Sequence, residues 1–99
     1  MPKVVSTELA PAAIGPYSQA LISGQTIYVS GQLPLDPKTG QMPEKAADQA
    51  KQSLKNIQAI IEAAGSSLQK VHRVGIFMTD LAEFAAVNEV YASFFTKDF

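Results

Sequence analysis

An α+β domain is the fold class that this sequence predicts, from a strand hairpin near the start, a long amphipathic helix after it, and a strand and second helix near the end. All 99 residues fit a single domain, residues 1–99, because no charge block, internal repeat or low-complexity tract divides them. The order strand, strand, helix, strand, helix favours a mixed sheet with two helices packed on one face. A right-handed crossover joins the second strand to the third if these two are parallel.

Two β-favouring runs predict the hairpin. They are residues 18–22 and 26–30, and Gly24 between them tolerates the positive φ that a tight turn requires. Side chains alternate between the two faces of a strand, so Ile27 and Val29 share one face. Ser30 is therefore expected on the other, more polar face, together with Thr26 and Tyr28.

A turn and the first helix follow the hairpin. Residues 36–40, Asp-Pro-Lys-Thr-Gly, predict a turn, because Asp accepts a local backbone hydrogen bond, Pro presets φ and Gly closes the turn. Apolar residues then recur at spacings of three and four, and Gly65 follows them where a left-handed cap is expected. This predicted apolar stripe consists of Ala47, Ala50, Leu54, Ile57, Ile61 and Ala64.

The last two predicted elements are a strand and a helix. Residues 71–79 alternate and carry apolar side chains on both faces, which is typical of a strand buried on both sides. Asp80 and Glu83 resemble a capping box at the start of the second helix. The apolar stripe of that helix is expected to contain Phe84, Val87, Tyr91 and Phe94.

Composition and charge restrict the function. A formal net charge of −1 provides little attraction for nucleic acid, so we expect no nucleic-acid partner. With no cysteine and His72 as the only histidine, we expect no metal site and no Ser-His or Cys-His nucleophile. The isolated glycines form no phosphate-binding loop, so we expect no cofactor. No apolar run is long enough for a signal peptide or a membrane span, and the expected location is the cytoplasm.

Four residues are candidates for a functional site, although each also has a structural interpretation. Tyr17 lies in a rigid Gly-Pro-Tyr context and is either fixed at a cleft rim or packed at a sheet edge. Ser30 and Gly31 end a strand, where a hydroxyl and an open backbone N–H can face a small anion or simply form a turn. Asn88 borders the second apolar stripe, where an amide is usually satisfied by backbone or water.

Four segments of the chain together resemble the RidA/YjgF family of enamine and imine deaminases. They are residues 14–19, Ile-Gly-Pro-Tyr-Ser-Gln; residues 28–34, Tyr-Val-Ser-Gly-Gln-Leu-Pro; residues 36–40; and residues 88–91, Asn-Glu-Val-Tyr. The resemblance implies the family's chorismate-mutase-like α+β fold. It also implies that the last two strands of that fold are missing from this chain, which would make the domain C-terminally incomplete.

The resemblance further implies a function and a site. RidA-like enzymes are homotrimers with clefts between subunits, and they hydrolyse 2-aminoacrylate and its imine tautomer to 2-keto acids and ammonia. Tyr17 and Ser30 fall on motif positions that imply catalytic roles, and Gly31 and Asn88 on positions that imply substrate binding. The partners implied are small imine and keto acid carboxylates.

One departure from the family concerns the substrate carboxylate. The family's carboxylate-binding arginine belongs to a segment beyond the position of Phe99, and Arg73, the single arginine here, does not match that motif. The resemblance therefore implies an enzyme impaired in the 99-residue form. A non-catalytic carboxylate-binding or regulatory module is the main alternative, and an RNA-directed inhibitor or nuclease is a third class.

Overall fold

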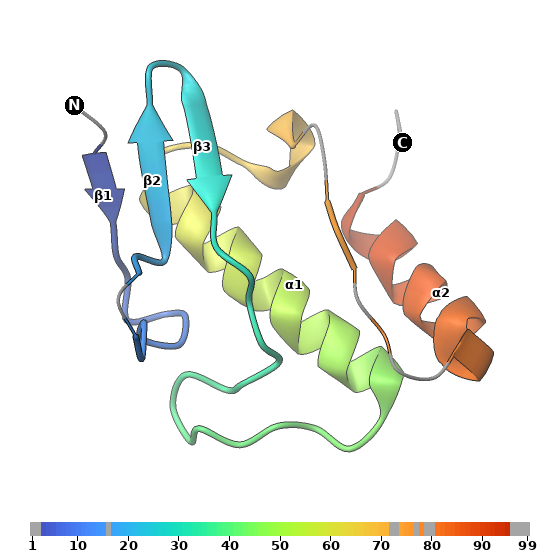
Figure 1. The fold of residues 1–99 in the computed structure, drawn as a ribbon. Coiled ribbons are helices and arrows are strands. Elements are labelled where there is room, and N and C mark those ends of the chain that lie inside the picture. The colour runs from blue at the N-terminus through green and yellow to red at the C-terminus, as the bar shows by residue number, and fades with distance from the viewer. Residues whose placement is uncertain (1–2, 16, 72–73, 77, 79–80, 96–99) are drawn as a thin grey trace.

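The computed structural model of the chain describes residues 3–15, 17–71, 74–76, 78 and 81–95. Within them lie a small sheet, two α-helices and two single turns of 3-10 helix (Figure 1). These elements are β1 (Lys3–Val5), β2 (Ala20–Ser23), β3 (Thr26–Val29), α1 (Ala46–Ala63), η1 (Leu68–Lys70), η2 (Leu81–Glu83) and α2 (Phe84–Phe94). The predicted α+β class is confirmed.

The sheet is antiparallel, and its strands follow one another in sequence order, β1-β2-β3. The predicted hairpin is confirmed, because Ser23 pairs with Thr26 and Gly24 has a φ of 60°. The sequence analysis missed β1, whose three residues are too few to show a pattern and which becomes a strand by pairing with β2. Among the described strands no parallel pair occurs, so this part of the sheet is not mixed.

Helix α1 covers one face of the sheet (Figure 1). Ile60, which is 0% exposed, packs in a core cluster with residues from β1, β2 and the loop between them. The members of that cluster are Val5, Ala10, Ala20 and Ile60, with Ile22, Ile27, Val29, Ala59 and Ala64 packed against it. The predicted alternation of β3 holds, since Ile27 and Val29 face this core and Tyr28 is 63% exposed.

Gly65 caps α1 as predicted. Its φ is 87°, its N–H donates to Glu62 O at 3.0 Å, and the Ser66 N–H donates to Ile61 O at 3.0 Å. This is the Schellman pattern, in which a left-handed residue allows the last carbonyl groups of a helix to be satisfied.

Replacing Gly65 by alanine is expected to lower the free energy of unfolding by about 1–2 kcal/mol, because a Cβ disfavours the left-handed conformation. Gly75→Ala is the matched control: Gly75 has no positive φ, and nothing lies within 4 Å of a Cβ placed there. Urea denaturation monitored by circular dichroism measures both changes. Equal destabilisation by the two variants would contradict the assigned role of the cap.

The predicted strand at residues 71–79 is wrong for the residues that the structure describes. Val71, residues 74–76 and Met78 belong to no strand, and Ile76 is 51% exposed rather than buried. An alternating sequence becomes a strand only when a neighbouring strand pairs with its N–H and C=O groups. Residues 72–73, 77 and 79 of the predicted strand, and Asp80 of the predicted capping box, lie outside the described residues.

Helix α2 lies alongside α1 (Figure 1). Of its predicted apolar stripe, Val87 is buried, Tyr91 and Phe94 are half-buried, and Phe84 is 58% exposed. The rings of Tyr91 and Phe95 are in contact, with centroids 4.7 Å apart. The second helix is thus confirmed, with a narrower buried face than predicted.

Candidate functional site

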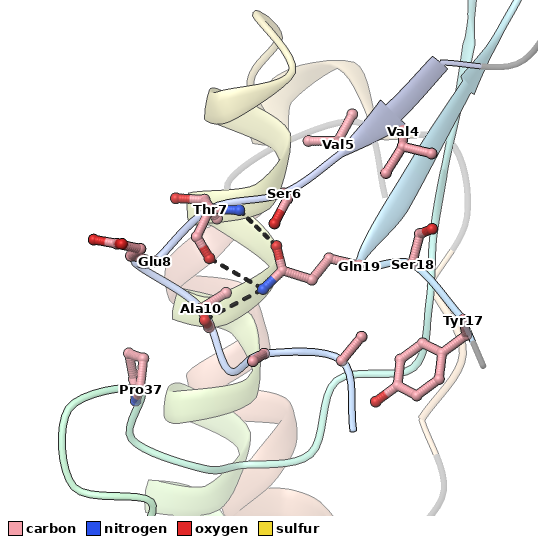
Figure 2. A pocket seen from close by; sticks show the side chains of 12 residues that line it. Val4, Val5, Ser6, Thr7, Glu8, Ala10, Tyr17, Ser18, Gln19 and Pro37 are labelled. Carbon is pink, nitrogen blue, oxygen red and sulfur yellow. Dashed lines mark hydrogen bonds between the residues drawn. The ribbon is translucent and has the colours of Figure 1, made fainter. Parts of the chain in front are cut away.

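An open hollow of about 670 Å³ lies beside the connection between β1 and β2 (Figure 2). Its wall includes Thr7 and Glu8 from the start of this connection and Tyr17, Ser18 and Gln19 from its end. Tyr17 and Glu8 lie on opposite sides of Gln19 in the view of Figure 2. The motif that carries the family resemblance therefore forms part of a concave surface.

Gln19 organises this connection through its side chain. The carboxamide is buried, its Oε1 accepts from the Thr7 N–H at 2.7 Å, and its Nε2 donates to Thr7 O at 3.1 Å. Nε2 also lies 2.7 Å from Pro11 O and 3.3 Å from Ala10 O. The sequence analysis quoted Gln19 only as part of a motif and missed this role, which a single polar residue before a strand does not reveal.

Ser30 is hydrogen-bonded to Ser18, the residue that follows Tyr17. Its Oγ donates to Ser18 O at 2.6 Å, and its backbone N–H donates to Gln19 O at 3.0 Å. A hydroxyl has one proton to donate and two lone pairs. Because the proton is directed to Ser18 O, the side chain of Ser30 presents an acceptor to any ligand.

Gly31 begins a segment that the first helix holds in place. No hydrogen bond donated by the Gly31 N–H is seen among the described residues, and a Cβ at this position would have nothing within 4 Å. The buried side chain of Asn56 in α1 donates to Leu33 O at 3.1 Å and to Leu35 O at 3.0 Å. The helix thereby fixes the backbone immediately after Gly31, a function of Asn56 that the sequence analysis missed.

Of the four predicted site residues, Tyr17, which is 49% exposed, lines the hollow, whereas Ser30 and Gly31 are not among the described residues of its wall. Ser30 is linked to that wall through its hydrogen bond to Ser18 O, and Gly31 follows Ser30 in the chain. Asn88 is exposed on α2, and no hydrogen bond described by the structure links it to the other three. Whether the four act in one site stays a prediction.

Two further properties concern metals and membranes. Within the described ranges, no three His, Asp or Glu side chains are grouped so that they could hold a metal ion. None of the described helices is both long enough and apolar enough to cross a membrane.

The structure defines an α+β domain with an open hollow beside its first loop, and the Ser30 hydroxyl is hydrogen-bonded to Ser18, a residue of the wall of that hollow. The sequence profile of the family described as Endoribonuclease L-PSP matches residues 7–99. The chain belongs to this family, which is the RidA/YjgF family.

The relatives of the chain are similar over nearly its full length. It is 50% identical over 97 residues to the 2-iminobutanoate/2-iminopropanoate deaminase of Escherichia coli, covering 98% of this chain and 76% of that protein. RidA from the Antarctic bacterium Psychrobacter sp. superposes with a TM-score of 0.94 at 44% identity, covering 98% of this chain and 79% of that chain. E. coli TdcF, solved with bound serine, gives a TM-score of 0.92 at 46% identity, covering 95% and 74%.

Proposed function

We propose that this chain hydrolyses enamine and imine intermediates of the 2-aminoacrylate and 2-iminopropanoate type to 2-keto acids and ammonia. The observation that carries the proposal is the 50% identity to an E. coli protein named for the deamination of 2-iminobutanoate and 2-iminopropanoate. This identity extends across both strands and the loop that form the candidate site, since it covers 98% of the chain.

The groups at the site suit this reaction. Water adds to the electrophilic imine carbon, the C=N bond breaks, and ammonia leaves as the carbonyl forms. This requires an oriented water and proton-exchange partners but no covalent nucleophile. We assign the orientation of water to the Tyr17 phenol and acceptance of a substrate N–H to Ser30 Oγ, whose own proton is held by Ser18 O.

The substrate carboxylate needs a hydrogen-bond donor. The Gly31 N–H is a suitable group, because Gly31 is exposed and the segment after it is fixed by Asn56. Asn88 is assigned to substrate binding on the family resemblance alone. Arg73, the single arginine of the sequence, lies outside the described residues, and we assign it no role.

We also propose that the chain assembles into a homotrimer. Val4, Leu21 and Tyr28 pair in register across the three strands, and they are 60%, 37% and 63% exposed. Such a row on the uncovered face of a sheet is typical of an interaction site, and the family resemblance implies that the copies meeting there form a trimer. In a cleft between subunits, Asn88 of one copy would face the other predicted site residues of a second copy. The expected cytoplasmic location stays a prediction.

The test is the release of pyruvate from 2-aminoacrylate that is generated enzymatically in the cuvette. We expect faster release with the 99-residue protein than with buffer, and a larger rate for a chimera extended by the C-terminal quarter of the E. coli relative. If neither protein accelerates hydrolysis, the deaminase proposal fails. Saturable binding of 2-ketobutyrate without turnover would then favour the non-catalytic binding module.

A ribonuclease activity is the second candidate, because the matched family carries that description. The formal charge of −1 gives the protein little attraction for a phosphate backbone. RNA cleavage that weakens as the salt concentration rises, in a preparation without imine hydrolysis, would favour this candidate.

Replacing Ser30 by alanine is expected to lower kcat/KM for imine hydrolysis by roughly tenfold, the effect of one hydrogen bond of about 1–2 kcal/mol. Ser23→Ala is the matched control, because Ser23 is exposed at the hairpin turn. Steady-state kinetics on enzymatically generated 2-aminoacrylate measure both variants. The assigned role of Ser30 is wrong if the two variants have equal kcat/KM.

A further inference from the structure

We propose that Gln19 is a positioning residue that fixes Tyr17 and Ser30 relative to each other. The expected effect of Gln19 on catalysis rests on the deaminase proposal, whereas its role in linking the loop to β3 does not. Gln19 directly precedes β2, and Tyr17 lies two residues before it. Gln19 therefore connects the β1–β2 loop, Tyr17 and the end of β3.

The side chain of Gln19 joins the two ends of the β1–β2 connection. Residues 6–19 separate Val5 from its strand partner Ala20, so this connection is long for a hairpin. The Gln19 carboxamide reaches back across it to both the N–H and the C=O of Thr7, at 2.7 and 3.1 Å. Loops of this kind are compact when their ends are close and their own side chains fill them.

The carboxamide also satisfies carbonyl groups inside the loop. Nε2 has two protons, and besides Thr7 O it has a short contact with Pro11 O at 2.7 Å and a longer contact with Ala10 O at 3.3 Å. Ala10 belongs to the core cluster, and Gln19 is only 4% exposed. The amide therefore satisfies backbone groups that are buried or partly buried, and its loss would remove this partner from each of them.

The backbone carbonyl groups of residues 18 and 19 link this loop to Ser30. Gln19 O accepts the Ser30 N–H at 3.0 Å, and the neighbouring Ser18 O accepts the Ser30 hydroxyl at 2.6 Å. A shift of residues 18–19 would therefore change the direction of the Ser30 lone pairs and of the Tyr17 side chain together. Small displacements of this kind reduce the rate of a reaction that depends on near-attack geometry.

The experiment compares Gln19→Met, which keeps the length of the side chain but removes its hydrogen bonds, with two controls in the 99-residue protein. Gln25→Met makes the same change in the exposed turn between β2 and β3. Leu68→Val removes one methylene from a buried residue of η1, which is outside the candidate site, and so controls for a general loss of stability.

The first readout is amide hydrogen exchange, which needs no activity. We expect Gln19→Met to raise the exchange rates of both the Thr7 and the Ser30 N–H by about tenfold or more relative to amides within the β2–β3 hairpin. Neither control should change these ratios. Faster exchange at Thr7 with unchanged exchange at Ser30 would overturn the inference, because the link to the third strand would be absent.

The second readout is the separation of kcat from KM in imine hydrolysis. We expect Gln19→Met to lower kcat by about tenfold or more with KM changed less than about threefold, and Leu68→Val to leave kcat unchanged. Equal losses of kcat in Gln19→Met and Leu68→Val would overturn the positioning role. If neither the wild-type protein nor the extended chimera is active, the proposed function is refuted instead, and the exchange measurement then decides the inference alone.

Discussion

Replacing Ile60 by alanine is expected to lower the free energy of unfolding by about 2–5 kcal/mol, a large part of the roughly 5–15 kcal/mol typical of a domain. Ile60 is fully buried where α1 meets β1 and β2. Truncation removes apolar contacts and leaves a cavity, because small neighbours such as Ala10 and Ala20 cannot extend into the space. Urea denaturation followed by circular dichroism measures the change.

Ile57→Ala is the matched control for this prediction. Ile57 lies in the same helix, so the change in helix propensity is the same, but its side chain is only half-buried. We expect a loss smaller than that of Ile60→Ala by at least about 1 kcal/mol. A loss at Ile57 as large as at Ile60 would contradict the position of the core.

Replacing Asn56 by leucine is expected to lower the free energy of unfolding by about 2–4 kcal/mol. The Asn56 side chain is 1% exposed, it donates to Leu33 O and Leu35 O, and its Oδ1 accepts from Gln52 Nε2 at 2.9 Å. Leucine has a similar branched shape, although it is larger, and it leaves two carbonyl groups without this donor; each unsatisfied buried group costs about 1–3 kcal/mol.

The matched control is Asn88→Leu, since Asn88 is also an asparagine within a helix but is exposed. We expect a change within about 0.5 kcal/mol for this surface substitution. Amide exchange in residues 31–35 should accelerate in Asn56→Leu and not in Asn88→Leu. Unchanged exchange there would show that Asn56 does not hold this segment.

Sequence patterns predicted the local elements of the fold better than their packing. The hairpin turn at Gly24 and the helix cap at Gly65 were predictable because each depends on one residue with a positive φ. The predicted apolar stripe of α1 included Ile57 and Ile61, of which Ile61 is buried and Ile57 is half-buried. The stripe did not include Asn56 and Ile60, which are the most buried residues of the helix. A hydropathy pattern assigns a buried asparagine to the surface, because its partners come from a distant loop.

The candidate site was predictable only in part, for a related reason. Tyr17, Ser30 and Gly31 were predicted because they fall on motif positions of a family; in the structure Tyr17 precedes Ser18, and the Ser30 hydroxyl donates to Ser18 O. The carboxamides of Gln19 and Asn56 hold the surrounding loops through backbone carbonyl groups. Any sequence offers such carbonyl groups at every position, so no pattern of side chains reveals these contacts.

The sequential order of the strands has a consequence for how the chain folds. The β2–β3 hairpin closes through two residues, so it can form within microseconds before other long-range contacts exist. Strand β1 must instead close the connection of residues 6–19, which has a greater loop-closure entropy. The first strand is thus expected to join a preformed hairpin late in folding, with Gln19 completing the loop as the edge of the sheet closes.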